Sequence, residues 1–176
     1  IAGPSLDGGM GDGGGCHPRD NIALSWLARE LDLSHDLFED VMVAREDQAR
    51  WLVDLMRASS DLPLGIMAAA YKPGSKLAAG SPALLCANLL MQDGEDVVIW
   101  DPVIPLGEHP DVLPPHVWLV GCKHPEFADL NLPEGSVVID PFRYIPDQPG
   151  VEVVRLGQWA PARTATSAST TPPLPA

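Results

Sequence analysis

The first feature that could carry chemistry is a cysteine on a glycine-rich loop. Cys16 ends the run GGGC and is followed by Pro18, Arg19 and Asp20 at the start of a predicted helix. Glycines allow backbone N–H groups to come close to a ligand, and the N–H dipoles at a helix start stabilise a thiolate. The thiolate is the nucleophilic form of cysteine, so this context predicts a reactive position at Cys16.

Further polar residues follow the predicted strands. Tyr71 and Lys72 come after one apolar run, Asp101 comes after the next, and two later runs lead into residues 122–124 and 140–143. Ligands of parallel α/β sheets bind at the carboxyl ends of the strands. We therefore expect most of these side chains to lie at one edge of a sheet.

The elements that position these residues follow an α/β pattern. Apolar residues recur at three- and four-residue spacing in residues 20–33 and 34–59, which predicts two helices, with Ser34 as the N-cap of the second. Ser81 and Pro82 begin a further helix, and Gly94 ends it. Five apolar runs have the length of strands: LPLGIMAAAY, VVIW, HVWLVG, GSVVID and GVEVVRLG. This order predicts a Rossmann-like parallel sheet with helices on both faces, preceded by a two-helix arm.

Charge and cysteine content limit the partners and the compartment. The chain has 24 acidic and 11 basic residues and a formal net charge of -13, which predicts no binding to nucleic acid or to an anionic membrane. No apolar run approaches the roughly 20 residues that span a bilayer, and no basic segment with a cleavage site opens the sequence, so we expect neither a membrane span nor a targeting segment. Three widely spaced cysteines form no disulfide framework, so we expect a cytoplasmic protein.

The remaining cysteines have simpler interpretations. Cys86 lies on the apolar face of its predicted helix and Cys122 ends a strand, so both are expected in the core. The spacing of Cys122 with His124 and His17 fits no zinc pattern, and the sequence predicts no metal site. His124 is expected in a loop beside the ligand-binding edge.

Several segments in the same order resemble one enzyme family. The segments are GGGCHPRD, AAAYKPGS, SPALLCANLL, VVIWDP, HPEF and VVIDPFR. Together they are similar to the C-terminal half of the UDP-glucose/GDP-mannose 6-dehydrogenases. The resemblance implies two Rossmann-like domains joined by a long helix, with NAD bound mainly by an N-terminal domain absent from this chain. It also implies that a sugar C6 alcohol is oxidised twice, to a uronic acid.

The resemblance divides the chain into three parts. Residues 1–60 are expected to contain the cysteine loop and a helical linker that serves in dimerisation. Residues 61–158 are expected to form the Rossmann-like nucleotide-sugar-binding domain. Residues 159–176, which are rich in Ala, Ser, Thr and Pro, are expected to be a disordered tail.

The family motifs also imply roles for particular residues. By match to the cysteine motif, Cys16 is the nucleophile that holds the aldehyde as a thiohemiacetal and then as a thioester, and Asp20 positions the hydrolytic water. Lys72 matches a lysine that contacts the nucleotide sugar, and Tyr71 stands in the place of a common phenylalanine. The other residues implied in substrate binding are Gly13, Gly14, Gly15 and Arg143.

The chain departs from the family pattern at several positions. Arg19 replaces a lysine, which keeps the charge and alters the hydrogen-bond geometry. Ala79 stands where the family has an arginine near the cofactor, and no GxGxxG turn occurs. We therefore expect the chain alone to be inactive as a dehydrogenase.

Three functions stay open at this point. The first is the catalytic and substrate-binding part of an NAD-dependent nucleotide-sugar dehydrogenase, whose partners are a nucleotide sugar, with a UDP-sugar expected, and a second copy of the chain or an NAD-binding half. The second is a degenerate nucleotide-sugar-binding or dimerisation module without catalysis. The third is a cysteine hydrolase, which we rank last because His17, as the neighbour of Cys16 in sequence, is poorly placed to act as its base.

Overall fold

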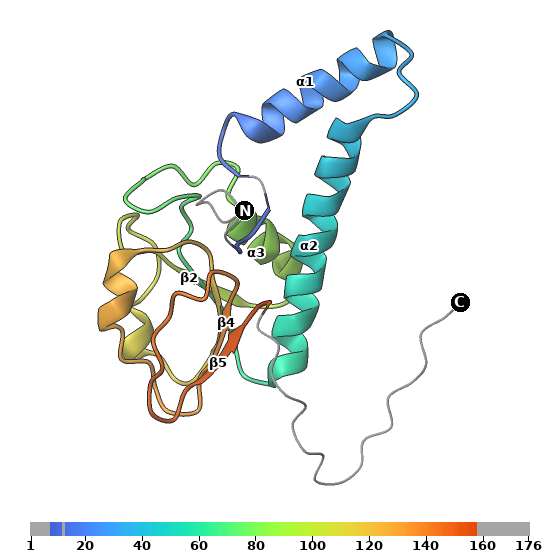
Figure 1. Cartoon of the computed structure of the whole chain (residues 1–176). Helices are drawn as coiled ribbons and strands as arrows, with labels where there is room; N and C mark the ends of the chain where they lie inside the picture. The colour runs from blue at the N-terminus through green and yellow to red at the C-terminus, as the bar shows by residue number, and fades with distance from the viewer. Residues whose placement is uncertain (1–7, 12, 158–176) are drawn as a thin grey trace, which may run out of the picture.

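The computed structural model describes residues 8–11 and 13–157, so the predicted tail at 159–176 lies outside the described residues. Its centre is a five-stranded sheet with the strand order β2-β1-β3-β4-β5 (Figure 1). The strands are β1 (Leu64–Met67), β2 (Val97–Trp100), β3 (Val117–Val120), β4 (Val137–Asp140) and β5 (Glu152–Arg155). Every neighbouring pair is parallel, which confirms the predicted Rossmann-like α/β sheet.

Two helices cover one face of the sheet. α2 (Leu37–Ser59) and α3 (Pro82–Gln92) bury their apolar sides against alternate residues of the central strands, among them Ile66 and Leu119. The residues that alternate with these along each strand, such as Met67, point to the opposite face. Because both faces are buried, the central strands read as continuous apolar runs rather than as alternating patterns.

Loops and two short 3-10 helices cover the second face. These helices are η2 (Pro110–Val112) and η3 (Pro125–Asp129), and they enclose a core around Trp118 and Phe127. We predicted helices on both faces, but among the described residues the α-helices that cover the sheet lie on one face only. A proline lacks an N–H donor and disrupts a helix interior, and the connection from β2 to β3 contains five of them. They are Pro102, Pro105, Pro110, Pro114 and Pro115.

The ends of α3 agree with the sequence pattern. Ser81 is the N-cap and its side chain accepts a hydrogen bond from the Leu84 N–H, while Pro82 is the first helical residue. Gly94 follows the C-cap with a φ of +88°, a conformation that glycine adopts without strain. The start of this helix is therefore fixed at the sheet edge where the candidate site lies.

α1 (His17–Glu30) and the first half of α2 form an arm that projects away from the sheet (Figure 1). The turn between them is held by Asp36, which accepts hydrogen bonds from the Glu39 N–H at 3.0 Å and from Ser25 Oγ at 2.6 Å. Asp36 is the N-cap of α2, so the prediction of Ser34 as N-cap is wrong. The carboxylate of Asp36 reaches both a backbone N–H and the neighbouring helix.

No helix within residues 8–11 and 13–157 combines the length and apolar character needed to cross a membrane.

Candidate active site

The cysteine loop is pressed against the loop that precedes α3. The Gly14 N–H donates a hydrogen bond to the Gly80 carbonyl at 2.9 Å. Gly14 has a φ of +86°, and a Cβ atom there would lie 2.8 Å from Tyr71 Cε2. A Cβ atom at Gly80 would lie 2.2 Å from the Gly14 carbonyl oxygen. Both glycines are required because two backbone segments and one aromatic ring meet without room for a side chain.

The three glycines before Cys16 have different surroundings. A Cβ atom at Gly13 would lie 2.9 Å from Pro82, and Gly14 is buried beneath Tyr71. Gly15 is exposed, and a Cβ atom there would meet nothing within 4 Å. Gly13 and Gly14 therefore serve to dock the loop, and Gly15 is the glycine whose backbone is open to a ligand.

Cys16 is exposed at the N-cap of α1, and its side chain makes no capping hydrogen bond. Asp20 lies in the first turn of the same helix, where its N–H donates to the Cys16 carbonyl at 2.8 Å. The helix begins at His17, so Asp20 lies inside it and is not its N-cap. Arg19 Nη2 lies 3.1 Å from Asp20 Oδ1, and both side chains are exposed. Cys16 and the two charged residues of the motif thus share one helix start.

Tyr71 and Lys72 are brought to the same place from the end of β1. The Tyr71 ring rests on Gly14, and Lys72 Nζ lies 5.3 Å from the centroid of that ring. Lys72 is exposed. The structure therefore joins Tyr71 and Lys72 to the cysteine loop, although 54 residues lie between Cys16 and Tyr71 in the sequence.

Arg143 lies beside the segment that leads into the cysteine loop. It is exposed with a φ of +54°, and a Cβ atom at Gly8 would lie 3.1 Å from Arg143 Nη2. Its loop is held by Asp140, which accepts hydrogen bonds from three backbone N–H groups, those of Phe142, Tyr144 and Ile145. Within the described residues the structure places Arg143 against the approach to the cysteine loop rather than against Cys16.

The other two cysteines are buried in the core. Burial raises the pKa of Cys86 and of Cys122 to about 12 in each case. At pH 8 a thiol with such a pKa is ionised in about one molecule in ten thousand. These thiols are therefore unsuited to nucleophilic chemistry. No group of three His, Cys, Asp or Glu side chains within 8–11 and 13–157 is arranged to hold a metal ion.

A cleft of about 410 Å³ opens between the start of α1, α2 and the start of α3. Ala79 lines it, together with Pro18 from α1 and Arg45 from α2. A cation therefore reaches this cleft from α2, although Ala79 itself supplies none. No sequence pattern pointed to Arg45, because its position beside the loop that precedes α3 depends on how the arm packs.

Two buried residues of the site edge were only partly anticipated. Asp101 was expected at a strand end, but its burial and its four backbone hydrogen bonds were not. His124 was expected in a loop beside the edge, and it lies at the N-cap of η3 with its side chain fully buried. A polar residue directly after a buried strand is the signal that marks such positions.

We expect Gly14→Ala to destabilise the chain by about 1–3 kcal/mol, because the new methyl group meets Tyr71 and must adopt a strained φ. The measurement is the free energy of unfolding from a urea titration. Gly15→Ala is the matched control, since space is open there, and we expect a change within about 0.5 kcal/mol. Equal effects of the two substitutions would contradict the docking of the loop through Gly14.

The fold and the site together define a class of protein. The parallel sheet with helices packed on it is a Rossmann-like α/β domain. Its candidate nucleophile, Cys16, lies on a glycine loop at the carboxyl ends of the strands, where such domains bind ligands. No model of a known protein family matches the chain. Individual proteins do match it, both in sequence and in structure.

Two curated relatives illustrate the sequence similarity. The UDP-glucose 6-dehydrogenase AglM of Haloferax volcanii is 32% identical over 106 residues, which cover 58% of this chain and 25% of that protein. The GDP-mannose 6-dehydrogenase of Pseudomonas aeruginosa is 28% identical over 93 residues, which cover 53% of this chain and 21% of that protein. The matched part of this chain is therefore similar in sequence to UDP-glucose and GDP-mannose 6-dehydrogenases and spans about a quarter of their length.

Solved structures share the fold over most of the chain. A ternary complex of GDP-mannose dehydrogenase from Pseudomonas aeruginosa aligns with a TM-score of 0.70 and 23% identity, covering 85% of this chain and 41% of that one. A UDP-glucose dehydrogenase from Pyrobaculum islandicum aligns with the same TM-score and identity, covering 86% and 39%. The chain therefore spans well under half of the length of these enzymes.

Proposed function

We propose that this chain supplies the catalytic cysteine and the nucleotide-sugar-binding part of an NAD-dependent nucleotide-sugar 6-dehydrogenase. The observation that carries the proposal is the docking of the Cys16 loop, through Gly14, onto Tyr71 of the loop that also presents Lys72. A reactive thiol and a cation that suits a phosphate group thereby belong to one surface. The relatives named above, two nucleotide-sugar dehydrogenases, support the substrate class.

The proposed chemistry uses the exposed thiol of Cys16. After the C6 alcohol has been oxidised to an aldehyde, attack by the thiolate forms a C–S bond and a thiohemiacetal. Loss of a hydride from the same carbon, and of the proton from its hydroxyl group to solvent, gives a thioester. Water positioned by Asp20 then cleaves the C–S bond, which releases the carboxylate and restores the thiol. Gly15, whose surroundings are open, leaves room for the sugar beside Cys16.

NAD would accept the hydride from each oxidation. The described residues do not fit a dinucleotide, because the connection from β1 to α3 is a long loop over residues 68–81 rather than a tight glycine turn into a helix. We propose that NAD is bound mainly by an N-terminal domain outside this chain. The residues present here are assigned to the substrate and to the thioester.

A degenerate binding or dimerisation module is the second candidate function. Ala79 favours it, because this residue lines the cleft beside the start of α3 and carries no charge where the family has an arginine. The presence of Arg45 in the same cleft favours the enzyme, because it supplies a cation there from another helix. Activity of a complete protein separates the two candidates.

We expect NADH formation only when this chain is joined to an NAD-binding domain of the same family. The test supplies NAD with UDP-glucose, UDP-N-acetylmannosamine or GDP-mannose and follows the absorbance of NADH. The chain alone is the control and should form none. NADH formation by the chain alone would contradict the assignment of NAD to another domain. A joined protein that binds NAD and oxidises none of the three sugars would support the degenerate module.

A further inference from the structure

The loop that carries Tyr71 and Lys72 begins with an unusual backbone conformation. Ala68, the residue after β1, is fully buried and has a φ of +79°, which a residue with a Cβ atom adopts only under strain. Its carbonyl oxygen lies against the end of β3, where a Cβ atom at Gly121 would approach it to 2.2 Å. Such a conformation persists only where the surrounding structure holds it in place.

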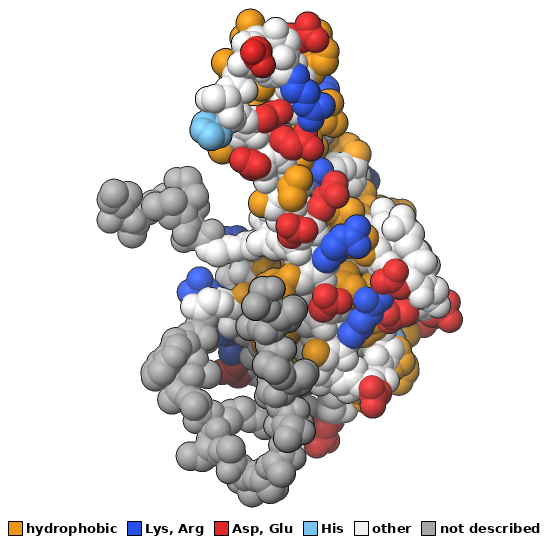
Figure 2. Space-filling view, turned by 90° about the vertical axis from the view of Figure 1, so that its right-hand side faces the viewer, with side chains coloured by type: hydrophobic (Ala, Val, Ile, Leu, Met, Phe, Trp, Pro, Cys, Tyr) orange, Lys and Arg blue, Asp and Glu red, His pale blue; other side chains and the backbone are white. Residues whose placement is uncertain are grey.

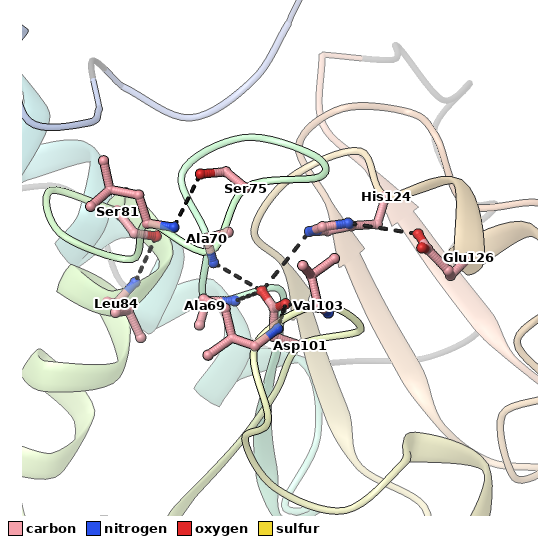
Figure 3. Close-up of polar contacts among 11 residues, drawn as sticks. Ala69, Ala70, Ser75, Ser81, Leu84, Asp101, Val103, His124 and Glu126 are labelled. Atoms are coloured by element: carbon pink, nitrogen blue, oxygen red, sulfur yellow. Dashed lines mark hydrogen bonds and ion pairs between the residues drawn. The ribbon is translucent and has the colours of Figure 1, made fainter.

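Asp101 provides that hold from the end of β2. Its Oδ2 accepts hydrogen bonds from the N–H groups of Ala69 at 2.9 Å and Ala70 at 3.0 Å. Its Oδ1 accepts two more at 2.8 Å each, from Val103 and Ile104 (Figure 3). Both carboxylate oxygens are thus occupied by backbone donors, and two loops are tied to one buried side chain.

His124 approaches the same carboxylate from the end of β3 (Figure 3). Its Nε2 lies 3.9 Å from Asp101 Oδ2, and its Nδ1 lies 3.7 Å from Glu126 Oε2. Neither ring nitrogen has a hydrogen-bond partner among the described residues, although the side chain is fully buried. The imidazole therefore lies between the carboxylates of Asp101 and Glu126 without a hydrogen bond to either.

The charge of Asp101 is maintained by these donors. Burial alone would raise its pKa, but the hydrogen bonds from the N–H groups of Ile104, Ala70 and Val103 hold the pKa below the usual value, with a smaller electrostatic contribution from His124. Asp101 is therefore a carboxylate at neutral pH. A carboxylate accepts at both oxygens, which the four N–H donors require.

We propose that Asp101 is the positioning residue for the substrate loop formed by residues 68–72. His124 lies against the carboxylate of Asp101. The side chain of Asp101 is fully buried, so the role assigned to it is to hold the loop and not to bind substrate. It fixes Ala69 and Ala70, which set the direction of Tyr71 and Lys72, and through the packing of Tyr71 on Gly14 it also steadies the cysteine loop. The part that concerns substrate rests on the proposed function. The part that concerns the two loops does not need a ligand.

The decisive variant is Asp101→Asn. An amide has one acceptor oxygen, so its NH2 group would face two backbone N–H donors and two of the four hydrogen bonds would be lost. We expect hydrogen–deuterium exchange to become at least about tenfold faster in residues 69–72 and to rise in residues 13–16. The dissociation constant for UDP-glucose should rise at least about tenfold in the same variant.

Asp140→Asn is the matched control, because Asp140 is equally buried at the end of β4 and accepts three backbone N–H groups of another loop. It should speed exchange in residues 142–145 and leave residues 69–72 unchanged. If Asp101→Asn alone does not fold, the double variant Asp101→Asn/Ala68→Gly gives the same readouts, because glycine accepts the φ of residue 68 without strain.

The outcomes separate this inference from the proposed function. Unchanged exchange in residues 69–72 of Asp101→Asn, or an equal rise over the whole chain, would overturn the positioning role. Faster exchange with an unchanged dissociation constant would overturn the role in substrate binding while the proposed function stands. If the wild-type chain binds no UDP-glucose, UDP-N-acetylmannosamine or GDP-mannose, the proposed function fails, and the exchange data alone decide whether Asp101 holds the two loops.

Discussion

Cys16→Ser should lower uronic acid formation at least about a thousandfold in a protein that joins this chain to an NAD-binding domain, because a serine hydroxyl is a far weaker nucleophile than a thiolate. Cys16 is exposed at a helix start, so the exchange of one atom changes the chemistry and little of the packing. The measurement is the amount of uronic acid formed from the nucleotide sugar, determined by mass spectrometry.

Cys86→Ser is the matched control. Cys86 is buried in α3 with its Sγ 3.7 Å from the Ala49 carbonyl, which a serine hydroxyl can also approach. We expect this variant to form uronic acid within about threefold of the wild-type rate, because Cys86 lies in the core and not at the site. If Cys16→Ser retains more than about a tenth of the wild-type rate, Cys16 is not the nucleophile.

Trp26→Asp should convert a dimer of this chain into monomers. The arm exposes many large apolar side chains, which lie beside acidic groups on the projecting helices (Figure 2). They are Ile22, Leu24, Trp26, Leu27, Leu31, Leu33, Leu37, Val41 and Val43. Apolar patches of this kind mark interfaces, and we propose that a second copy of the chain covers them. A charge in place of an interface tryptophan typically costs at least about 2–4 kcal/mol of binding free energy.

Sedimentation velocity at several protein concentrations measures this effect. Val112→Asp is the matched control, because Val112 is 73% exposed on η2, which is not part of the arm, and its replacement should leave the dimer intact. A monomeric wild-type chain would contradict the second copy as partner. In that case, burial of the arm on joining to an NAD-binding domain would identify that domain as the occupant.

The sheet was predictable because the patterns that specify its strands and helices lie within short stretches of sequence. Strands buried on both faces are apolar throughout, and many helices begin with a residue whose side chain accepts from a free N–H group, as Ser81 does. The second helix start was predicted at Ser34 and lies at Asp36, because Asp36 also accepts from Ser25, which a local pattern does not contain. The covering of the second face was missed for a related reason, since it depends on how loops fold over the sheet.

The candidate site was predictable in its residues and not in its geometry. The glycines before Cys16 and the polar residues after the strands are visible in the sequence. The packing of Gly14 under Tyr71 depends on a positive φ and on a contact between distant segments. The burial of Asp101 depends on four N–H donors from two loops. Such contacts follow from the assembled fold and leave no local pattern.

The most direct test of the account is the detection of a substrate adduct on Cys16. Asp20→Asn, in the protein joined to an NAD-binding domain, should slow the release of the thioester because the side chain that positions water is altered. After addition of NAD and the nucleotide sugar, mass spectrometry of the peptides should find the acyl group on Cys16 and none on Cys86 or Cys122. Turnover in the wild-type protein with no adduct in Asp20→Asn, or with the adduct on another residue, would contradict the assignment of Cys16 as the nucleophile.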